Sequence, residues 1–220
     1  MLDGRTIGVL WDMDGVIVDT GDAHYDSWKN TLKRYNLPCT RDFFNETFGM
    51  NNRGVIALIL GRPGTDEEVE AIAGLKEELF REDIKGRLAP LPGVPYWLDR
   101  FARAGFPQAV ASSAPIENVD AIIDDLGLRP KFAALVSGSE LPGKPDPSTF
   151  LLAARTIGVP PESCLVIEDA KVGVQAAKRA GMRCVAVCTT HPAHELAGAD
   201  LVVDRLSDLT AEALEAVFAG

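Results

Sequence analysis

Short hydrophobic runs alternate along the chain with segments whose hydrophobic residues recur about every 3.6 positions. The runs are hydrophobic throughout rather than at every second position, so both faces of each should be buried, as in a parallel sheet. Six runs have the length of a strand: 7–11, 108–111, 133–136, 164–167, 184–187 and 201–203. Amphipathic segments such as 94–104 and 118–126 predict helices, and Asp146 with Pro147 has the residue types of an N-cap and a first helical position. This order predicts an α/β fold with a doubly wound, Rossmann-like parallel sheet.

One long interval breaks the alternation. After the first run, the next strand-like run begins at residue 108, and the stretch between holds helical patterns, one of them with a hydrophobic face at Trp28 and Tyr35. The part over 66–85 is dense in charge, which is typical of a solvated helix face. We therefore expect an inserted α-helical cap domain. Its predicted limits are residues 20–87, and the α/β core domain is predicted to comprise residues 1–19 and 88–220.

The composition is that of an ordinary globular protein. Of 220 residues, 46% are hydrophobic and 25% are charged, which excludes collagen-like, low-complexity and strongly disordered chains. The 22 lysines and arginines against 32 aspartates and glutamates give a net charge of −10. A broad surface for nucleic acid or for an anionic membrane is therefore not expected. To bind a small anionic substrate, such a protein would need a local positive charge, from a metal ion or a lysine, to offset the repulsion.

Cysteine usage and the N-terminal residues indicate the compartment. The four cysteines, Cys39, Cys164, Cys184 and Cys188, include no Cys-x-x-Cys pair for zinc, and we interpret them as reduced core residues. Residues 1–5 lack the basic-then-apolar order of a signal peptide, and no hydrophobic run approaches the roughly 20 residues of a membrane span. We expect a cytoplasmic protein that is a monomer or a weak homodimer.

Polar residues suited to phosphate chemistry follow several predicted strands. In a doubly wound sheet, ligands bind beyond the carboxyl ends of the strands, where such residues meet. In chain order they are Asp12, Asp14 and Gly15, then Ser112 and Ser113, then Lys144, and finally Glu168 and Asp169. Carboxylates in such an array repel one another unless a hard divalent cation lies among them, and Mg²⁺ prefers oxygen ligands. The set predicts phosphoryl transfer on an aspartate.

Each residue type in this set has a part in that chemistry. The expected metal ligands are Asp12, Glu168 and Asp169, together with a backbone carbonyl near Asp14. A carboxylate can attack phosphorus in line and form an aspartyl-phosphate, and a second carboxyl two residues on can protonate the leaving oxygen and then deprotonate water. Lys144 and Ser112 would bind the phosphoryl oxygens. Gly15 permits a sharp turn that brings backbone N–H groups toward the same phosphate.

Four ordered motifs resemble those of the haloacid dehalogenase-like superfamily, and the resemblance covers essentially the whole chain. The motifs are Asp-Met-Asp-Gly-Val-Ile-Val-Asp-Thr at 12–20, Ala-Ser-Ser at 111–113, Gly-Lys-Pro-Asp-Pro at 143–147 and Ile-Glu-Asp-Ala-Lys-Val-Gly at 167–173. The resemblance implies a Mg²⁺-dependent enzyme with Asp12 as nucleophile, Asp14 as general acid and base, Ser112 and Lys144 as phosphate binders, and Glu168 and Asp169 as magnesium ligands. The helical insertion resembles the small cap of the subgroup that contains β-phosphoglucomutase and many sugar-phosphate phosphatases.

Two reactions stay open within that subgroup. The presence of Asp14 disfavours a dehalogenase and a phosphonate-cleaving enzyme, because both of those groups lack an acid at this position. A phosphatase acting on a small phosphorylated metabolite, such as a sugar phosphate, is favoured over a mutase. The reason is that Ala114, Pro115 and Ile116 stand where the mutase holds a second phosphate with polar and basic side chains. A regulatory protein without turnover is disfavoured because all the carboxylates are present.

Several further residues have alternative interpretations. Candidate substrate-binding residues are Gly15, Ser113, His24, Arg53 and Lys76. Helix residues of this kind are often merely packed or solvated, and Ser113 has a simpler structural interpretation. Asp19 either caps the first helix of the cap or contacts substrate, and we interpret it as a residue of the hinge or one that lies behind the substrate site. We interpret Gly173 as a point where a helix packs closely on the sheet.

Overall fold

The computed structural model describes residues 6–219 and contains a six-stranded parallel sheet with the order β3-β2-β1-β4-β5-β6. The strands are β1 (Gly8–Trp11), β2 (Gln108–Ser112), β3 (Ala134–Ser137), β4 (Cys164–Glu168), β5 (Arg183–Val187) and β6 (Leu201–Val203). All six predicted strands are present, each within one residue of its expected ends. The α/β, doubly wound fold class is confirmed. Residues 1–5, on which the expectation about a signal peptide rests, lie outside the described part of the chain.

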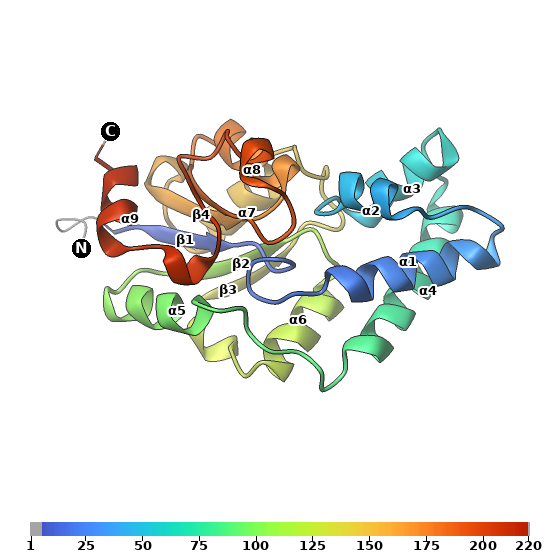
Figure 1. Ribbon diagram of the computed structural model, residues 1–220, viewed down its shortest axis with the longest axis horizontal. Helices are drawn as coiled ribbons and strands as arrows, with labels where there is room; N and C mark the ends of the chain where they lie inside the picture. The colour runs from blue at the N-terminus through green and yellow to red at the C-terminus, as the bar shows by residue number, and fades with distance from the viewer. Residues whose placement is uncertain (1–5, 220) are drawn as a thin grey trace.

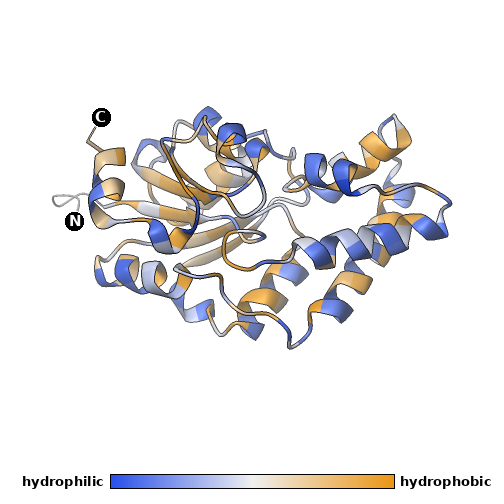
Figure 2. Ribbon diagram, in the orientation of Figure 1, coloured by the Kyte–Doolittle hydropathy of each residue, from blue (hydrophilic) through white to orange (hydrophobic). Residues whose placement is uncertain are grey.

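Helices cover both faces of the sheet, as its uniformly hydrophobic strands require (Figure 1). Successive side chains of a strand point to opposite faces, so Val9 and Trp11 join one hydrophobic cluster and Leu10 joins another. The first cluster is completed by α5 (Val94–Arg103), α6 (Ile116–Asp125) and α9 (Ala211–Val217), and the second by α7 (Ser148–Thr156) and α8 (Lys171–Arg179). Figure 2 shows the same division, with orange strands between helices whose outer faces are blue.

Four more helices lie between β1 and α5 and make a separate hydrophobic core. They are α1 (Gly21–Arg34), α2 (Arg41–Thr47), α3 (Asn52–Leu60) and α4 (Asp66–Ile84). Figure 1 shows them together to one side of the sheet, and their core includes Trp28, Phe44 and Ile56. This is the helical insertion expected between the first and second strands. No helix within residues 6–219 is long and hydrophobic enough to cross a membrane.

The chain passes twice between the sheet and the helical cap, and the two passages lie side by side. Val18 and Pro90 form an isolated antiparallel bridge. The backbone N–H of Leu91 also donates a hydrogen bond to the carbonyl of Ile17, at 2.8 Å. Paired extended segments of this kind give a narrow connection about which the cap can move relative to the sheet.

Helix α4 differs from the solvated helix expected over 66–85. Ile72 packs in the core of the cap, whereas Phe80 packs in the larger cluster beneath the sheet, so α4 joins the two parts. Between these residues lie Lys76 and Glu77, which are only 2% and 5% exposed. The expectation of a solvated face is therefore wrong for these two charges, because they pair with each other inside the protein.

Three smaller expectations need correction. Helix α7 has Pro147 as its N-cap, and Asp146 instead accepts a hydrogen bond from the backbone N–H two residues further on, at 2.9 Å. Tyr35 ends α1 and is 41% exposed, so it does not continue the hydrophobic face of that helix. All four cysteines are free thiols, but Cys39 and Cys188 are only partly buried.

Candidate active site

The candidate catalytic residues come together at the carboxyl ends of three adjacent strands and at one loop. Asp12 and Asp14 follow β1, Ser112 ends β2, Glu168 ends β4 and precedes Asp169, and Lys144 comes from the loop before α7. Strands β2, β1 and β4 are neighbours in the sheet, so their ends open onto one edge. The structure thus brings together six residues that lie as far apart in the sequence as Asp12 and Asp169.

Lys144 organises the charges at this edge. Its Nζ donates to Asp12 Oδ1 at 2.5 Å and to Glu168 Oε1 at 2.6 Å, and its side chain is completely buried. Burial alone would lower the pKa of Lys144, but the two carboxylates outweigh burial and raise it above its ordinary value. The ammonium group is therefore charged and holds Asp12 and Glu168 side by side.

Asp12, Glu168 and Asp169 form a buried carboxylate cluster whose oxygens lie within 4.8 Å of one another. Glu168 is fixed, since its Oε2 accepts hydrogen bonds from the backbone N–H groups of Asp169 and Ala170, both at 2.7 Å. Asp169 Oδ2 accepts a hydrogen bond from the hydroxyl of Thr190, but the buried Oδ1 has no hydrogen-bond partner within residues 6–219. A buried carboxylate oxygen without a partner is costly. The oxygen ligands and the missing partner fit a hard divalent cation.

Burial raises the pKa of two carboxyl groups in the cluster. For Asp12, burial outweighs the opposing effect of Lys144 and, with the negative charge of Glu168, raises the pKa from 3.8 to about 7. For Asp169, burial and then the charges of Glu168 and Asp12 raise the pKa well above 3.8. The cluster therefore carries more negative charge than Lys144 alone can compensate.

Asp14 lies beside the cluster and turns its carboxylate toward the cap. Its Oδ1 accepts a hydrogen bond from the Thr20 hydroxyl at 2.5 Å and lies 3.2 Å from His24 Nε2. Burial would raise the pKa of Asp14, but His24 and Thr20 outweigh it and lower the pKa below 3.8. The Asp14 side chain is outside the three-carboxylate cluster, so its predicted metal contact through a backbone carbonyl stays a prediction.

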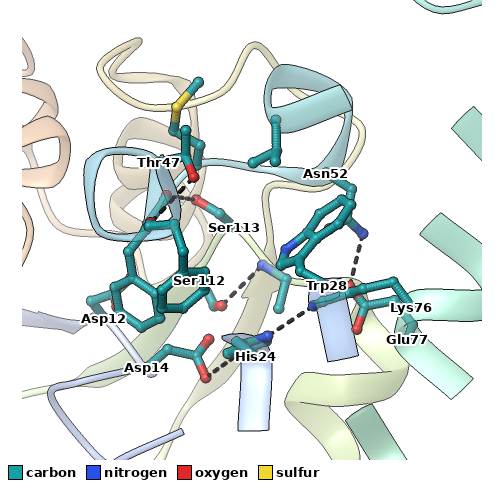
Figure 3. A pocket seen from close by; sticks show the side chains of 16 residues that line it. Asp12, Asp14, His24, Trp28, Thr47, Asn52, Lys76, Glu77, Ser112 and Ser113 are labelled. Carbon is teal, nitrogen blue, oxygen red and sulfur yellow. Dashed lines mark hydrogen bonds and ion pairs between the residues drawn. The ribbon is translucent and has the colours of Figure 1, made fainter. Parts of the chain in front are cut away.

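A chain of hydrogen bonds leads from Asp14 into the cap (Figure 3). His24 Nδ1 lies 2.8 Å from Lys76 Nζ, and the imidazole stacks on Phe80 with ring centroids 3.9 Å apart. Lys76 Nζ also donates to Glu77 Oε1 at 2.9 Å. An ammonium group only donates hydrogen bonds, so Nδ1 accepts and Nε2 carries the proton that faces Asp14. His24 and Lys76, both predicted to bind substrate, thus lie at the site and are joined to its second aspartate.

A small cavity separates the sheet edge from the cap. Its lining includes Asp12, Asp14, Ser112, Ser113 and Ala114 from the core, and His24, Trp28, Phe48, Asn52, Lys76 and Glu77 from the cap. The cavity measures about 50 Å³, far below the several hundred Å³ typical of a pocket that holds a small-molecule ligand. The structure therefore shows the cap closed over the site.

The two serines after β2 have different surroundings. Ser112 is buried, lines the cavity and accepts a hydrogen bond from the backbone N–H of Ala114 at 3.1 Å. Ser113 donates its hydroxyl proton to the carbonyl of Gly49 in the cap, at 2.9 Å. Ser113 thus makes a contact between core and cap, which agrees with its structural interpretation.

Gly15 and Arg53 do not take the positions expected of substrate-binding residues. The N–H of Gly15 is directed at the carbonyl of Val18, 2.7 Å away, and not into the cavity. Its φ of 84° and its closeness to Asp169, where a Cβ would come within 1.9 Å of Oδ2, explain the glycine. Arg53 is exposed, lies outside the cavity lining and pairs with Asp66 at 2.9 Å.

Sequence reasoning missed several residues of the site. Thr190 and Thr20 each hold a site carboxylate, and Glu77 and Asn52 line the cavity. Of these residues, only Glu77 could have been found from the sequence. Its neighbour Lys76 lies on the hydrophobic face of α4, four residues after Ile72, where a solvated lysine is not expected. Gly173 is a point where α8 packs closely on the sheet, as expected, since a Cβ there would lie 1.6 Å from Oε1 of Glu168 at the end of β4.

Known proteins share both this sequence pattern and this structure. The family profile described as haloacid dehalogenase-like hydrolase matches residues 9–187. The β-phosphoglucomutase of Bacillus subtilis (strain 168) is 35% identical over 216 residues, which cover 94% of this chain and 92% of that protein. Fructose-1-phosphate phosphatase YqaB of Escherichia coli (strain K12) is 34% identical over 184 residues, covering 83% of this chain and 97% of the relative.

A solved structure extends the comparison. The crystal structure of CbbY from Rhodobacter sphaeroides in complex with xylulose-(1,5)bisphosphate superimposes with a TM-score of 0.84. It is 26% identical in sequence, and the match covers 96% of this chain and 99% of that one. Sheet, cap and the edge between them are therefore shared over almost the entire length of both chains.

Proposed function

This chain belongs to the haloacid dehalogenase-like hydrolase family, and we propose that it is a Mg²⁺-dependent phosphatase acting on a small sugar phosphate through an aspartyl-phosphate intermediate. The observation that carries the proposal is the buried cluster of Asp12, Glu168 and Asp169, with Lys144 at its edge and Asp14 beside it. The fructose-1-phosphate phosphatase among the relatives supports the substrate class.

The three clustered carboxylates would hold the cation. Asp169 is suited to this role because its buried Oδ1 has no hydrogen-bond partner in the described part of the chain. When bound, Mg²⁺ neutralises carboxylate and phosphate charge and so allows an anionic substrate to approach an acidic site. Asp12 and Asp169 must be ionised to act as ligands, although their raised pKa values favour the protonated forms in the metal-free protein.

Asp12 is the proposed nucleophile. One carboxylate oxygen attacks phosphorus in line, the bond from phosphorus to the sugar oxygen breaks, and the sugar leaves as an alcohol after taking a proton. Water then attacks the phosphorus of the aspartyl-phosphate, which releases inorganic phosphate and restores the Asp12 carboxylate. Lys144 Nζ, 2.5 Å from Asp12 Oδ1, and the buried Ser112 hydroxyl are suited to bind the phosphoryl oxygens.

Asp14 is the proposed general acid and base. The negative charge of an arriving phosphate raises the pKa of a nearby carboxyl, so Asp14 can take up the proton that it later gives to the leaving sugar oxygen. In the second step it takes a proton from the attacking water. Its contacts with Thr20 and His24 stabilise the ionised form needed for that second step.

Release of phosphate, as opposed to its transfer within the sugar, tests this proposal. We would incubate the enzyme and Mg²⁺ with β-glucose 1-phosphate and a glucose 1,6-bisphosphate primer, and with a panel of sugar monophosphates and an aryl phosphate. The proposal predicts Mg²⁺-dependent release of inorganic phosphate from at least one sugar monophosphate. Stoichiometric conversion of the 1-phosphate to glucose 6-phosphate would show a mutase instead, and no turnover of any phosphomonoester would overturn the proposal.

A further inference from the structure

A polar wall closes the cavity on the side opposite Asp12. Figure 3 shows Asn52, Lys76 and Glu77 facing Asp12 across the cavity, and we call these three residues the distal wall. Asn52 and Glu77 also line a larger hollow on the outer side of the wall, about 640 Å³ in volume, between α3, α4 and the start of α6. The distal wall therefore lies where the part of a substrate remote from the reacting phosphate must go.

Glu77 is the centre of the distal wall. Its Oε1 accepts hydrogen bonds from Lys76 at 2.9 Å and from Asn52 Nδ2 at 2.8 Å, and its Oε2 accepts one from Asn118 Nδ2 at 2.5 Å. Burial would raise the pKa of Glu77, but the ammonium group of Lys76, its direct partner, outweighs burial and lowers the pKa, so the carboxylate is ionised. A buried, ionised carboxylate thus faces the leaving-group end of the cavity.

The positively charged side chains near the distal wall already have hydrogen-bond or ion-pair partners, and acidic residues are more numerous there. Among residues 6–219, Lys76 is the only lysine or arginine in the cavity lining, and it pairs with Glu77. The outer hollow is lined by Arg53 and Arg81 together with the acidic residues Asp66, Glu70, Glu77, Glu117 and Glu140. Arg53 pairs with Asp66, and Arg81 donates to Asn118 Oδ1 at 2.8 Å. A second anionic group on the substrate would find carboxylates on both sides of the wall.

We propose that the distal wall selects phosphomonoesters of neutral polyhydroxy compounds and rejects substrates that carry a second phosphate or a carboxylate. This proposal rests on the phosphatase function proposed above and refines its substrate class. A carboxylate only accepts hydrogen bonds, so sugar hydroxyls can donate to Glu77 while Asn52 both donates and accepts. A phosphate dianion has no proton to donate, and its charge next to Glu77 is repulsive. The wall therefore favours one class of leaving group and disfavours the other.

The wild-type enzyme gives the first test. We would measure kcat/KM with Mg²⁺ for fructose 1-phosphate and for fructose 1,6-bisphosphate. Whichever phosphate of the bisphosphate is hydrolysed, the other stays attached to the departing sugar. We expect kcat/KM to be at least about 100-fold higher for the monophosphate, because placing like charges together is strongly unfavourable in a buried site. Equal use of the two substrates within threefold, or a preference for the bisphosphate, would overturn the proposal.

Substitution of Glu77 tests whether the wall causes this preference. In Glu77→Gln the positive charge of Lys76 is no longer neutralised, so the preference for the monophosphate should fall at least about tenfold. The ratio of two substrates in one preparation does not depend on the fraction of enzyme that is folded. Glu78→Gln, an exposed residue of the same helix, is the matched control and should keep the wild-type ratio.

A second variant, Asn52→Lys, and a second substrate, an aryl phosphate, complete the test. Asn52→Lys adds an ammonium group to the same wall and should likewise lower the preference at least about tenfold, including where Glu77→Gln does not fold. An unchanged ratio in a folded Glu77→Gln, or in Asn52→Lys, would overturn the role of the wall. Hydrolysis of an aryl phosphate separates this result from a failure of the phosphatase function itself, since that failure would abolish all phosphate release.

Discussion

Single buried charges determine how this site responds to pH. Asp12 has a pKa of about 7, and the pKa of Asp169 is also raised, because both carboxyl groups are buried beside other carboxylates. Between the unfolded value of 3.8 and the folded value, the folded state binds more protons than the unfolded state. The free energy of unfolding of the metal-free protein should therefore fall from about pH 4 to pH 7, by up to about 1.4 kcal/mol per pH unit for each such group.

This dependence leads to a prediction about metal binding. Because Mg²⁺ needs the ionised carboxylates, its stabilising effect should be small at pH 5 and should increase up to pH 8. Thermal unfolding with excess chelator and with millimolar Mg²⁺, at pH 5, 6, 7 and 8, measures the difference in Tm. Asp169→Asn should lose most of the increase, whereas the exposed Asp26→Asn should keep it. A Mg²⁺ effect independent of pH would contradict the assigned ligands.

Side chains that directly follow a strand could be identified from the sequence, because the topology brings all such positions to one edge. Asp12, which follows β1, is of this kind, and so is Glu168, which ends β4 and follows the hydrophobic run 164–167. Thr190, which donates to Asp169 Oδ2, could not be identified, because it lies 21 residues away in a loop without any hydrophobic pattern to place it. Hydrogen-bond partners of this sort depend on how loops pack, and no periodicity reports that.

Among the helices, α8 has its first turn packed directly against the side chain of Glu168. Gly173 is the third residue of α8, and a Cβ at this position would lie 1.6 Å from Glu168 Oε1, inside the buried site. Helix propensity alone predicts that alanine would be better than glycine here. The contact with Glu168 predicts the opposite, because the carboxylate is fixed by its hydrogen bonds to Lys144 and to two backbone N–H groups.

Two glycine-to-alanine variants separate these effects. Gly173→Ala should lower the free energy of unfolding by about 1–3 kcal/mol, the usual cost of overpacking a buried site. Gly74→Ala in α4, where a Cβ would meet nothing within 4 Å, should instead raise it by about 0.5–1 kcal/mol. Urea denaturation in the presence of chelator measures both. An increase of similar size in the two variants would contradict the packing assigned to Gly173.

The sequence pattern predicts the strands well but not the surroundings of α4. The predicted strands agree with the structure to within one residue because a parallel strand covered on both faces is hydrophobic over most of its length. The pattern misrepresented α4, because dense charge there concealed a buried Lys76–Glu77 pair. Burial of an ion pair depends on what packs against the helix from elsewhere, here His24 of α1 and Asn118 of α6. A helix's own periodicity does not contain that information.

At the scale of the whole molecule, the cap and the sheet enclose a cavity too small for a sugar phosphate. Entry of substrate therefore requires the cap to move about the paired passages near Val18 and Pro90. Closure then brings His24 to Asp14 and Glu77 to Asn118, so the contacts that complete the site are contacts between the two parts. The net charge of −10 is also locally organised, with carboxylates at the catalytic edge and around the outer hollow.

The proposed mechanism depends on a covalent aspartyl-phosphate at Asp12, and a rapid acid quench detects this intermediate. Enzyme, Mg²⁺ and a sugar monophosphate labelled with ³²P would be mixed, quenched within milliseconds, digested with protease and mapped for label. We predict an acyl-phosphate on the peptide containing Asp12, and specifically on Asp12 and not Asp14. Asp12→Asn should remain folded, carry no label and release no phosphate. Label on another residue, or continued Mg²⁺-dependent phosphate release by Asp12→Asn, would exclude Asp12 as the nucleophile.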